Sequence, residues 1–290
     1  MLFSQSIPSQ NLGFVDPKAT LLEMNIGDRD LTIHQSPTIL SSNRGGGTTG
    51  AGTPPSALLA STANRVYPVV WKITPLFASW ISSPSNVLFQ QDVLNSKSLV
   101  LELGCGISGI IGLALSQMVE SFVLTDQDYV MKLLNQNLDE NRPSAASTTK
   151  GRKSSAKSKR GSAHTSQATD VGNVIAKCLD WETDEVTPSL TGSELIDSFD
   201  VVIACDCIYN DALINPLVQT CVDACKLRGD GPEGKPTVCI VAQQLRSAEV
   251  FEDWLKAFHK MFSTWRIPDE KLIDGLKTDS GFVLHIGILR

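Results

Sequence analysis

From Leu99 onward, short and continuous apolar runs alternate with segments whose apolar residues recur at helical spacing. Val201–Ile203 form one such run, and Val250, Trp254 and Phe258 lie on one face of an expected helix. Strands that are apolar on both faces belong to parallel sheets covered by helices on each side. The pattern therefore predicts an α/β fold.

The same pattern places the individual elements along the chain. The expected strands cover residues 98–104, 121–126, 174–181, 199–206, 237–243 and 282–289, with a further strand near 263–267. The expected helices cover residues 108–119, 129–141, 212–227 and 248–262, and residues 68–81 form an extended piece that enters a helix. Upstream, residues 21–36 read as two short strands around the turn 27–30, which is a β-hairpin.

Two polar segments interrupt this organisation. Residues 41–56 are rich in Ser, Gly, Thr and Pro and are expected to form a flexible loop. Residues 143–170 are expected to be a disordered insertion, in which six of the eleven residues from Lys150 to Arg160 are basic. The insertion is either a nuclear signal or RNA contact, or a solvated segment without a specific role. We divide the chain into an N-terminal hairpin and Gly/Ser-rich segment, 1–65, and a main domain, 66–290.

Length and charge narrow the class of protein. The chain has 290 residues and a formal net charge of −6, so a general attraction to nucleic acid or to acidic membranes is not expected. Its N-terminus lacks the features of a signal peptide, and no apolar run approaches the ~20 residues that span a bilayer. Seven cysteines without a CxxC pair favour buried, reduced thiols, and no metal site is expected. We expect a monomer in the cytoplasm, with the nucleus as a further location.

A glycine loop follows the first strand and opens a helix. Gly104, Gly106 and Gly109 let the backbone turn sharply and leave no Cβ between the chain and a ligand. In parallel sheets, ligands bind beyond the carboxyl ends of the strands. The loop therefore predicts a nucleotide-type site, and its G-x-G-x-x-G spacing alone also fits NAD.

Carboxylates at three strand ends favour S-adenosylmethionine over NAD. Glu102 stands just before the loop, where it would oppose a pyrophosphate but suits the ammonium and sulfonium groups of S-adenosylmethionine. Asp126 ends the second strand and can accept hydrogen bonds from ribose hydroxyls. Asp180 ends the third strand and can accept from the adenine amino group, while Trp181 packs on the ring. We also place Ala204, near the end of the fourth strand, among the cofactor-binding residues.

These motifs resemble those of the class I, seven-β-strand methyltransferases, and most closely the family-16 protein-lysine methyltransferases. The motifs that carry the resemblance are Glu102–Gly106, Thr125–Asp126, Asp180–Trp181 and Asp206–Tyr209, with 47–50 and Val70–Trp71 upstream. The resemblance implies a Rossmann-like fold with a seven-stranded, mostly parallel sheet and helices on both faces, plus the hairpin. It also implies that Trp71 lines the cofactor pocket. Because about twenty residues separate Gly50 from Trp71, Gly47 and Gly50 are given no role.

The acceptor end is expected at Asp206–Tyr209, which leaves the fourth strand beside the cofactor. Related enzymes that methylate amides or base amino groups carry a Pro-Pro pair here, and this chain has none at 207 or 208. The motif therefore favours a tetrahedral amine, and the resemblance points to a lysine of a protein, with ribosomal proteins among the acceptors. We expect Asp206 to orient the amine and Tyr209 to form a wall of the acceptor channel.

Other functions are compatible with parts of this pattern. A methyltransferase for a small-molecule amine would share the fold and the cofactor. An NAD-dependent oxidoreductase would share the glycine loop and Asp126, and a non-catalytic scaffold would share only the fold.

Overall fold

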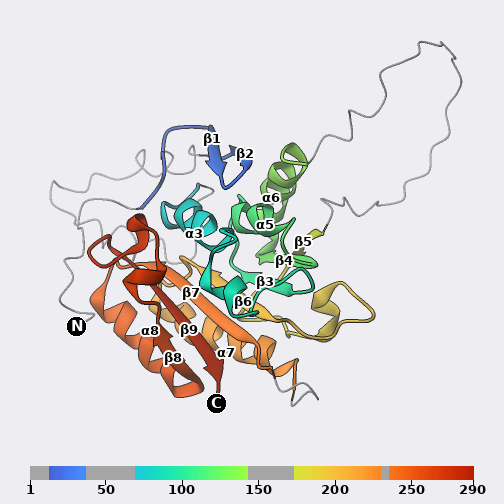
Figure 1. The fold of residues 1–290 in the computed structure, drawn as a ribbon, viewed down its shortest axis with the longest axis vertical. Coiled ribbons are helices and arrows are strands. Elements are labelled where there is room, and N and C mark those ends of the chain that lie inside the picture. Colours follow the sequence, from blue (N-terminus) through green and yellow to red (C-terminus); the bar gives the residue numbers. More distant parts are fainter. Residues whose placement is uncertain (1–12, 37–68, 143–172, 230–234) are drawn as a thin grey trace, which may run out of the picture.

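The computed structural model describes residues 13–36, 69–142, 173–229 and 235–290 (Figure 1). Its centre is a seven-stranded sheet with the strand order β5-β4-β3-β6-β7-β9-β8. In that order the strands are β5 (Val174–Cys178), β4 (Ser121–Asp126), β3 (Leu99–Leu103), β6 (Val201–Cys205), β7 (Val238–Gln244), β9 (Phe282–Leu289) and β8 (Phe262–Arg266). β9 runs antiparallel to both of its neighbours, and the other pairings are parallel. The predicted α/β fold with a mostly parallel sheet is confirmed.

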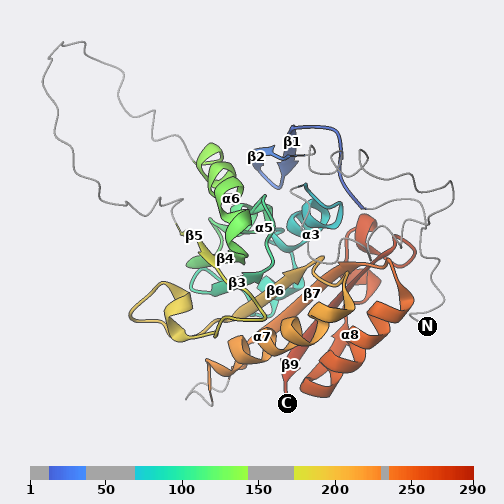
Figure 2. The same cartoon turned by 180° about the vertical axis from the view of Figure 1, so that it is seen from behind.

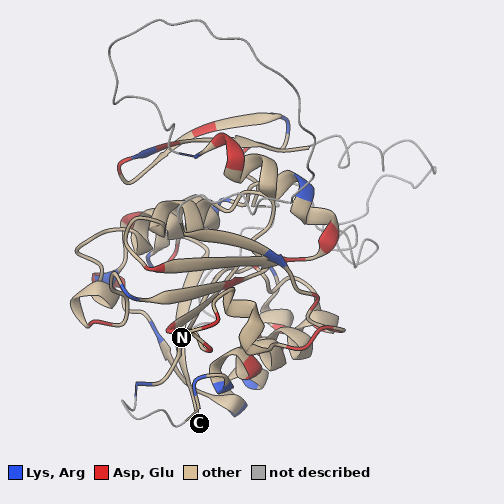
Figure 3. Ribbon diagram, turned by 90° about the vertical axis from the view of Figure 1, so that its right-hand side faces the viewer, with Lys and Arg blue, Asp and Glu red and all other residues tan. Residues whose placement is uncertain are grey.

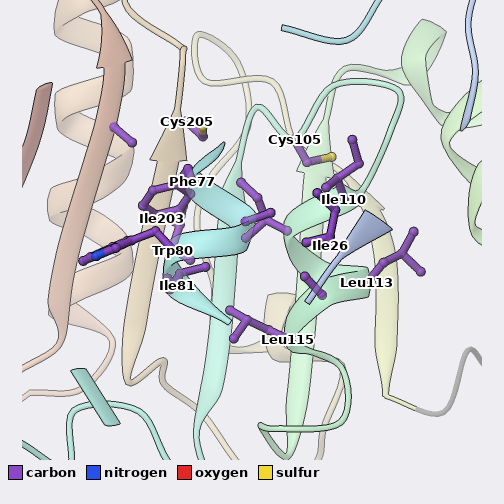
Figure 4. Close-up of a cluster of buried hydrophobic side chains, with 14 of the residues drawn as sticks. Ile26, Phe77, Trp80, Ile81, Cys105, Ile110, Leu113, Leu115, Ile203 and Cys205 are labelled. Carbon is purple, nitrogen blue, oxygen red and sulfur yellow. The ribbon is translucent and has the colours of Figure 1, made fainter. Parts of the chain in front are cut away.

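Helices cover both faces of the sheet (Figures 1 and 2). The α-helices are α3 (Ile73–Ile81), α4 (Val87–Gln90), α5 (Ile110–Leu115), α6 (Asp128–Glu140), α7 (Ile214–Lys226) and α8 (Ala248–Met261). Short 3-10 helices cover Pro188–Thr191, Asp211–Leu213, Asp269–Lys271 and Asp274–Leu276. Helices α3, α5 and α6 pack on one face and form the core drawn in Figure 4. Helices α7 and α8 pack side by side on the other face and form a second core.

The topology fixes where a ligand can bind. β3 lies between β4 and β6, and the chain continues from β3 to one side, through β4 and β5, before it crosses to β6 and β7 on the other. The strand order therefore switches direction between β3 and β6, and the carboxyl ends of these strands flank the crevice that such a switch creates. The residues at those ends are the residues that the sequence marks as a site.

The predicted hairpin is present as β1 (Leu21–Ile26) and β2 (Arg29–His34), with Gly27 in a left-handed turn. Helix α6 supplies partners for the free edge of β2. The Asn137 side chain accepts from the amide of His34 at 2.7 Å and donates to its carbonyl oxygen at 2.9 Å. Asn141 makes the same pair of bonds with Thr32, each at 2.8 Å. Two asparagines four residues apart thus bond the backbone groups of β2 that a third strand would otherwise pair with.

Several predicted bounds differ from the structure for local reasons. The helix expected at 108–119 is shorter, because Gly109 takes a left-handed conformation with φ +57° and α5 begins only after it. The strand expected at 174–181 ends at Cys178. Beyond it, Asp180 Oδ1 accepts from the Glu182 amide at 2.9 Å, which turns the chain away from the sheet. The predicted segments 41–56 and 143–170 lie outside the described residues, and the domain division stays a prediction.

The described residues hold all seven cysteines as free thiols, six of them buried and Cys178 exposed. Over the same residues, no helix combines the length and the apolar character needed to cross a membrane. No group of three or more His, Cys, Asp or Glu residues is placed there to hold a metal ion.

Candidate functional site

The large sheet carries few charged residues on its strands (Figure 3). They are Glu102, Asp126, Lys177 and Arg266. Glu102 and Asp126 lie on adjacent strands and are 2% and 6% exposed. Both point to the face that carries α3 and α5, because they alternate with the side chains of the second core. The two acidic residues of the sheet are thus buried together at the predicted site.

The glycine loop connects these two carboxylates. Gly104 and Gly106 have φ values of +67° and +64°, so both need the left-handed freedom of glycine. The amide of Gly106 donates to Asp126 Oδ2 at 2.8 Å, which ties the loop to the end of β4. A Cβ at Gly106 would have nothing within 4 Å, whereas a Cβ at Gly104 would stand 2.8 Å from Cys207 Sγ. The loop is therefore packed at its first glycine and open at its second.

Glu102 is a buried acidic residue whose hydrogen-bonding capacity is not fully used within the described protein. Its Oε2 atom is buried and has no hydrogen-bond partner among the described residues. Burial, and after it the charge of Asp126, raises the pKa of the Glu102 carboxyl to about 8. A buried carboxyl with this pKa keeps its proton near neutral pH and ionises when a cation binds beside it. The ammonium group of S-adenosylmethionine would supply both the charge and the missing donor.

Asp126 is held in place by the backbone. Its Oδ1 accepts from the amide of Gln127 at 2.8 Å, and its Oδ2 accepts from Gly106. Burial raises the pKa of Asp126 to about 6, although both hydrogen bonds act in the opposite direction. Each oxygen keeps a further lone pair, so the predicted contact with ribose hydroxyls is compatible with this arrangement.

Asp180 and Trp181 follow β5, at the same carboxyl edge of the sheet as Asp126. Gln127 Nε2 donates to Asp180 Oδ2 at 3.0 Å, so Asp180 is linked to the residue after Asp126. The indole of Trp181 lies against Gly104, since a Cβ there would stand 2.9 Å from Trp181 Cζ2. Trp181 Nε1 is buried and has no hydrogen-bond partner in the described chain. The structure thus brings Asp180 and Trp181 to the glycine loop and to the end of β4.

Asp206 follows β6 directly and is 5% exposed. Both oxygens accept from Arg246, with Nη1–Oδ1 at 2.7 Å and Nη2–Oδ2 at 2.6 Å. The amide of Gln244 also donates to Oδ1 at 3.2 Å. The carboxylate predicted to orient the amine is therefore already engaged with a cation, a relationship that the sequence did not indicate.

Tyr209 is half-buried, and Cys207, Tyr129, Asp126 and Asp206 influence the ionisation of its phenol. Burial first, and these groups after it, raise the pKa of the phenol above its usual range, so the hydroxyl stays protonated. Tyr209 therefore lies within electrostatic range of both Asp126, at the end of β4, and Asp206.

Two predicted cofactor residues occupy different surroundings. Trp71 packs against Phe14 with ring centroids 4.6 Å apart, and the Arg246 guanidinium lies over its ring at 4.7 Å. Trp71 is thus linked to Asp206 through Arg246. Ala204 is fully buried, and its side chain belongs to the core under α7 and α8, on the opposite face from Glu102. The Ala204 side chain therefore cannot contact a ligand on the Glu102 face of the sheet.

Sequence reasoning missed Arg246, Gln244 and Cys207. Cys207 Sγ donates to the carbonyl oxygen of Leu103 at 3.2 Å and so closes the space beside Gly104. Arg246 follows β7, the strand next to β6, and so stands at the same carboxyl edge of the sheet as Asp206. No sequence motif marks it.

The strand order, with an antiparallel strand inserted next to the last parallel one, and the glycine loop with its strand-end acids define a class I methyltransferase fold. Residues 57–153 and 162–258 match the model of the family described as lysine methyltransferase. The chain belongs to this family, which confirms the resemblance seen in its motifs and favours the lysine branch over the alternative functions.

Three fungal proteins are similar to large parts of this chain, and two of them carry a lysine methyltransferase name. The ribosomal lysine N-methyltransferase 5 of Zygosaccharomyces rouxii is 30% identical over 204 residues, covering 65% of this chain and 62% of that protein. The protein of the same name from Vanderwaltozyma polyspora is 27% identical over 271 residues, covering 83% and 80%. A Schizosaccharomyces pombe protein named diaminohydroxyphosphoribosylamino-pyrimidine deaminase is 26% identical over 262 residues. That match covers 90% of this chain, which spans 50% of the length of the deaminase.

Solved structures show a more distant similarity. The N-methyltransferase NodS from Bradyrhizobium japonicum, in complex with S-adenosylhomocysteine, has a TM-score of 0.41 at 10% identity and covers 81% of this chain and 97% of NodS. An rRNA methylase from Streptococcus thermophilus has a TM-score of 0.39 at 10% identity and covers 74% of this chain and 95% of the methylase.

Proposed function

We propose that this protein transfers a methyl group from S-adenosylmethionine to the side-chain amine of a lysine in another protein. The observation that carries the proposal is the buried Glu102 carboxylate, whose Oε2 atom has no hydrogen-bond partner in the described chain and lies on the strand that leads into the glycine loop. A cationic nucleoside matches this charge, and a pyrophosphate does not.

The residues assigned to the cofactor fit its chemistry one by one. Glu102 would accept from the ammonium group, Gly104 and Gly106 would let the backbone approach, and Asp126 would accept from the ribose. Asp180 and Trp181 would hold the adenine, with Trp71 and the backbone of Ala204 at the border of the site. When bound, S-adenosylmethionine supplies a methyl group activated by the positive charge on sulfur.

The acceptor residues must manage the charge of lysine. Its ordinary pKa is about 10.4, so roughly 1 in 1,000 side chains is neutral at pH 7, a handicap of about 4 kcal/mol. Tyr209 walls the channel with an aromatic ring, and desolvation there favours the neutral amine. Because the pKa of Tyr209 lies above its usual range, the phenol is a hydrogen-bonding group and not a base for the leaving proton. Asp206 accepts from the amine and orients it.

A protein acceptor, and more specifically a ribosomal protein, is the substrate we propose. The support is the name shared by several relatives, ribosomal lysine N-methyltransferase 5. The charge of the site agrees with a basic partner. Asp180, Glu182, Asp184 and Glu185 follow β5 within one short segment, and the last three are exposed. Such a cluster of exposed acidic residues attracts the lysine-rich segments of proteins that bind RNA.

We further propose that the protein is a monomer in the cytoplasm and that it also enters the nucleus. Sedimentation and imaging of a tagged protein would check these two points.

Labelling of a lysate tests this function. The protein is incubated with methyl-tritiated S-adenosylmethionine and a ribosome-depleted or ribosome-enriched lysate fraction. We expect label in a protein band of the ribosomal fraction, and mass spectrometry should place it on lysine. Glu102→Gln serves as the control that loses the label. Label in small molecules alone would overturn the protein acceptor, and binding of NAD without S-adenosylhomocysteine would overturn the cofactor.

A further inference from the structure

Arg246 and Asp206 form a buried, bidentate ion pair at the acceptor end of the site. Their side chains are 13% and 1% exposed, and both Asp206 oxygens accept from the guanidinium at 2.7 and 2.6 Å. Asp206 follows β6, and Arg246 lies two residues beyond β7, which pairs with β6. The amide of Asp206 also donates to the carbonyl oxygen of Ala242 at 2.7 Å. The pair therefore joins the carboxyl ends of two neighbouring strands.

The guanidinium is itself fixed from three sides. Its Cζ atom lies over the Trp71 ring, 4.7 Å from the ring centroid, and Nη2 donates to Gln244 Oε1 at 3.1 Å as well as to Asp206. Phe14 packs on Trp71, and the amide of Lys72 donates to the carbonyl oxygen of Gly13 at 2.6 Å, so an N-terminal segment holds Trp71 in place. Stacking and a two-pronged contact are properties of arginine that lysine does not share.

Asp206 needs this support because its backbone is strained. Its φ is +62°, a conformation that a residue with a side chain seldom adopts, and it begins the turn that leads to Tyr209. The contact with Arg246 and the Gln244 amide fixes the carboxylate on the sheet. The position of Tyr209 therefore depends on a contact made by Arg246.

Charge is the second consequence of the pair. A free carboxylate beside a lysine acceptor would stabilise its ammonium form and so oppose transfer, which requires the neutral amine. A carboxylate paired with a guanidinium still accepts a hydrogen bond but carries little net charge. Among the described residues, the other titratable groups that interact electrostatically around Asp206 are Cys205, Cys207, Tyr209, Glu102 and Asp126, and Lys72 follows Trp71 in the chain. Arg246 is the cation that contacts Asp206.

We propose that Arg246 is a positioning residue of the acceptor site, which holds Asp206 in its strained turn and cancels its charge so that lysine is bound as the neutral amine. This inference rests on the proposed function.

The test is the pH dependence of kcat at saturating peptide, because this profile reports the ionisation of the bound complex. Arg246→Met removes the charge and the contact but keeps most of the length. We expect the apparent pKa of the acidic limb to rise by about one unit. Asp206→Asn leaves the positive charge of Arg246 unbalanced, so the apparent pKa of the acidic limb should fall in this variant. The double variant should return this apparent pKa close to the wild-type value. Arg246→Lys keeps the charge but not the two-pronged contact, so kcat should drop about tenfold without a shift of the profile.

Arg228→Met is the matched control. Arg228 pairs with Asp200 at 2.5 Å just before the other end of β6, and it is partly buried as well. This variant should lose stability but keep the kcat profile. Affinity for S-adenosylhomocysteine, measured by calorimetry, should stay within a few fold in all Arg246 variants, since Arg246 is not assigned to the cofactor.

The outcomes distinguish a wrong role for Arg246 from a wrong function for the protein. Suppose that the wild-type protein labels lysine and that Arg246→Met retains the wild-type kcat. The proposed role of Arg246 is then wrong and the proposed function stands. Arg246→Lys serves in the same way if Arg246→Met does not fold. A lower kcat with an unshifted profile in Arg246→Met would overturn the charge effect. If the wild-type protein binds S-adenosylhomocysteine but labels no lysine, the proposed function fails and the inference falls with it.

Discussion

The side-chain amide of Asn137 donates to the backbone carbonyl oxygen of Ile107, inside the glycine loop, at 2.8 Å. The same side chain exchanges two hydrogen bonds with the backbone of His34 in the hairpin, and it is fully buried. One amide thus connects an N-terminal strand with the loop that we assign to the cofactor. The hairpin is therefore part of the support of the site.

Asn137→Leu should weaken both the fold and the cofactor site. It leaves three backbone groups without partners, and each such group costs about 1–3 kcal/mol when it stays buried. We expect a lower midpoint of urea unfolding and a lower affinity for S-adenosylhomocysteine by calorimetry. Asn141→Leu is the control, because Asn141 bonds Thr32 and its own helix but not the glycine loop. An equal loss of affinity in both variants would contradict the connection.

Gly106→Ala should remove cofactor binding without a clash inside the protein. The new methyl group would point into space with no atom within 4 Å, which we assign to the ligand, and the left-handed φ costs roughly 1–2 kcal/mol. Gly229 offers a close control, since its φ is +58° and its Cβ would also be free. Both variants should lose similar stability. Only Gly106→Ala should bind S-adenosylhomocysteine about tenfold or more weakly, and unchanged binding would exclude the open space as the ligand site.

Glu102 should link cofactor binding to proton release. Its pKa is raised from 4.5 to about 8, so the folded protein without ligand keeps a proton that the unfolded chain releases between these values. Stability of the ligand-free protein should therefore fall as pH rises from about 5 through about 8, and Glu102→Gln should flatten this slope. Binding of a cationic ligand requires the ionised carboxylate.

Calorimetry at pH 7 in two buffers of different ionisation enthalpy measures the released proton. The wild-type protein should release close to one more proton than Glu102→Gln on binding S-adenosylhomocysteine. Asp126, with a pKa of about 6, is mostly ionised at that pH and contributes little. Identical proton release by the two proteins would show that Glu102 does not meet the ligand's cation.

Tyr209 should act through its ring and not through its hydroxyl. Because its pKa is raised above the usual range, the phenol stays neutral and supplies no base. Tyr209→Phe should therefore retain methyl transfer within a few fold. Tyr209→Ala should lower the rate roughly 100-fold, because the amine loses its alignment. The measurement is the initial rate with labelled cofactor, and a loss of activity in Tyr209→Phe as large as in Tyr209→Ala would refute the wall role.

The fold was largely predictable because its strands are continuous apolar runs, such as Val201–Ile203, and hydrophobic periodicity reports burial directly. The site was predictable where chemistry sits at strand ends, as for Glu102 and Asp126. Arg246 was not, because its role depends on which strands are neighbours, and one chain of residues carries no mark of that pairing. The relation of Asn137 to Ile107 and His34 was hidden for the same reason, since a buried asparagine in a helix looks like any surface residue in the sequence.

β8 pairs with β9 alone among the described strands, although it precedes β9 in the chain. During synthesis, β8 must wait for residues 282–289 before it has any place in the sheet, and β7 has an open edge until then. The aromatic stack of Trp254, Phe258 and Phe262 is meanwhile covered only in part. Until β9 is synthesised, the nascent protein therefore exposes the edge of β7 together with part of this apolar surface, and during this interval it is open to aggregation and to binding by a chaperone.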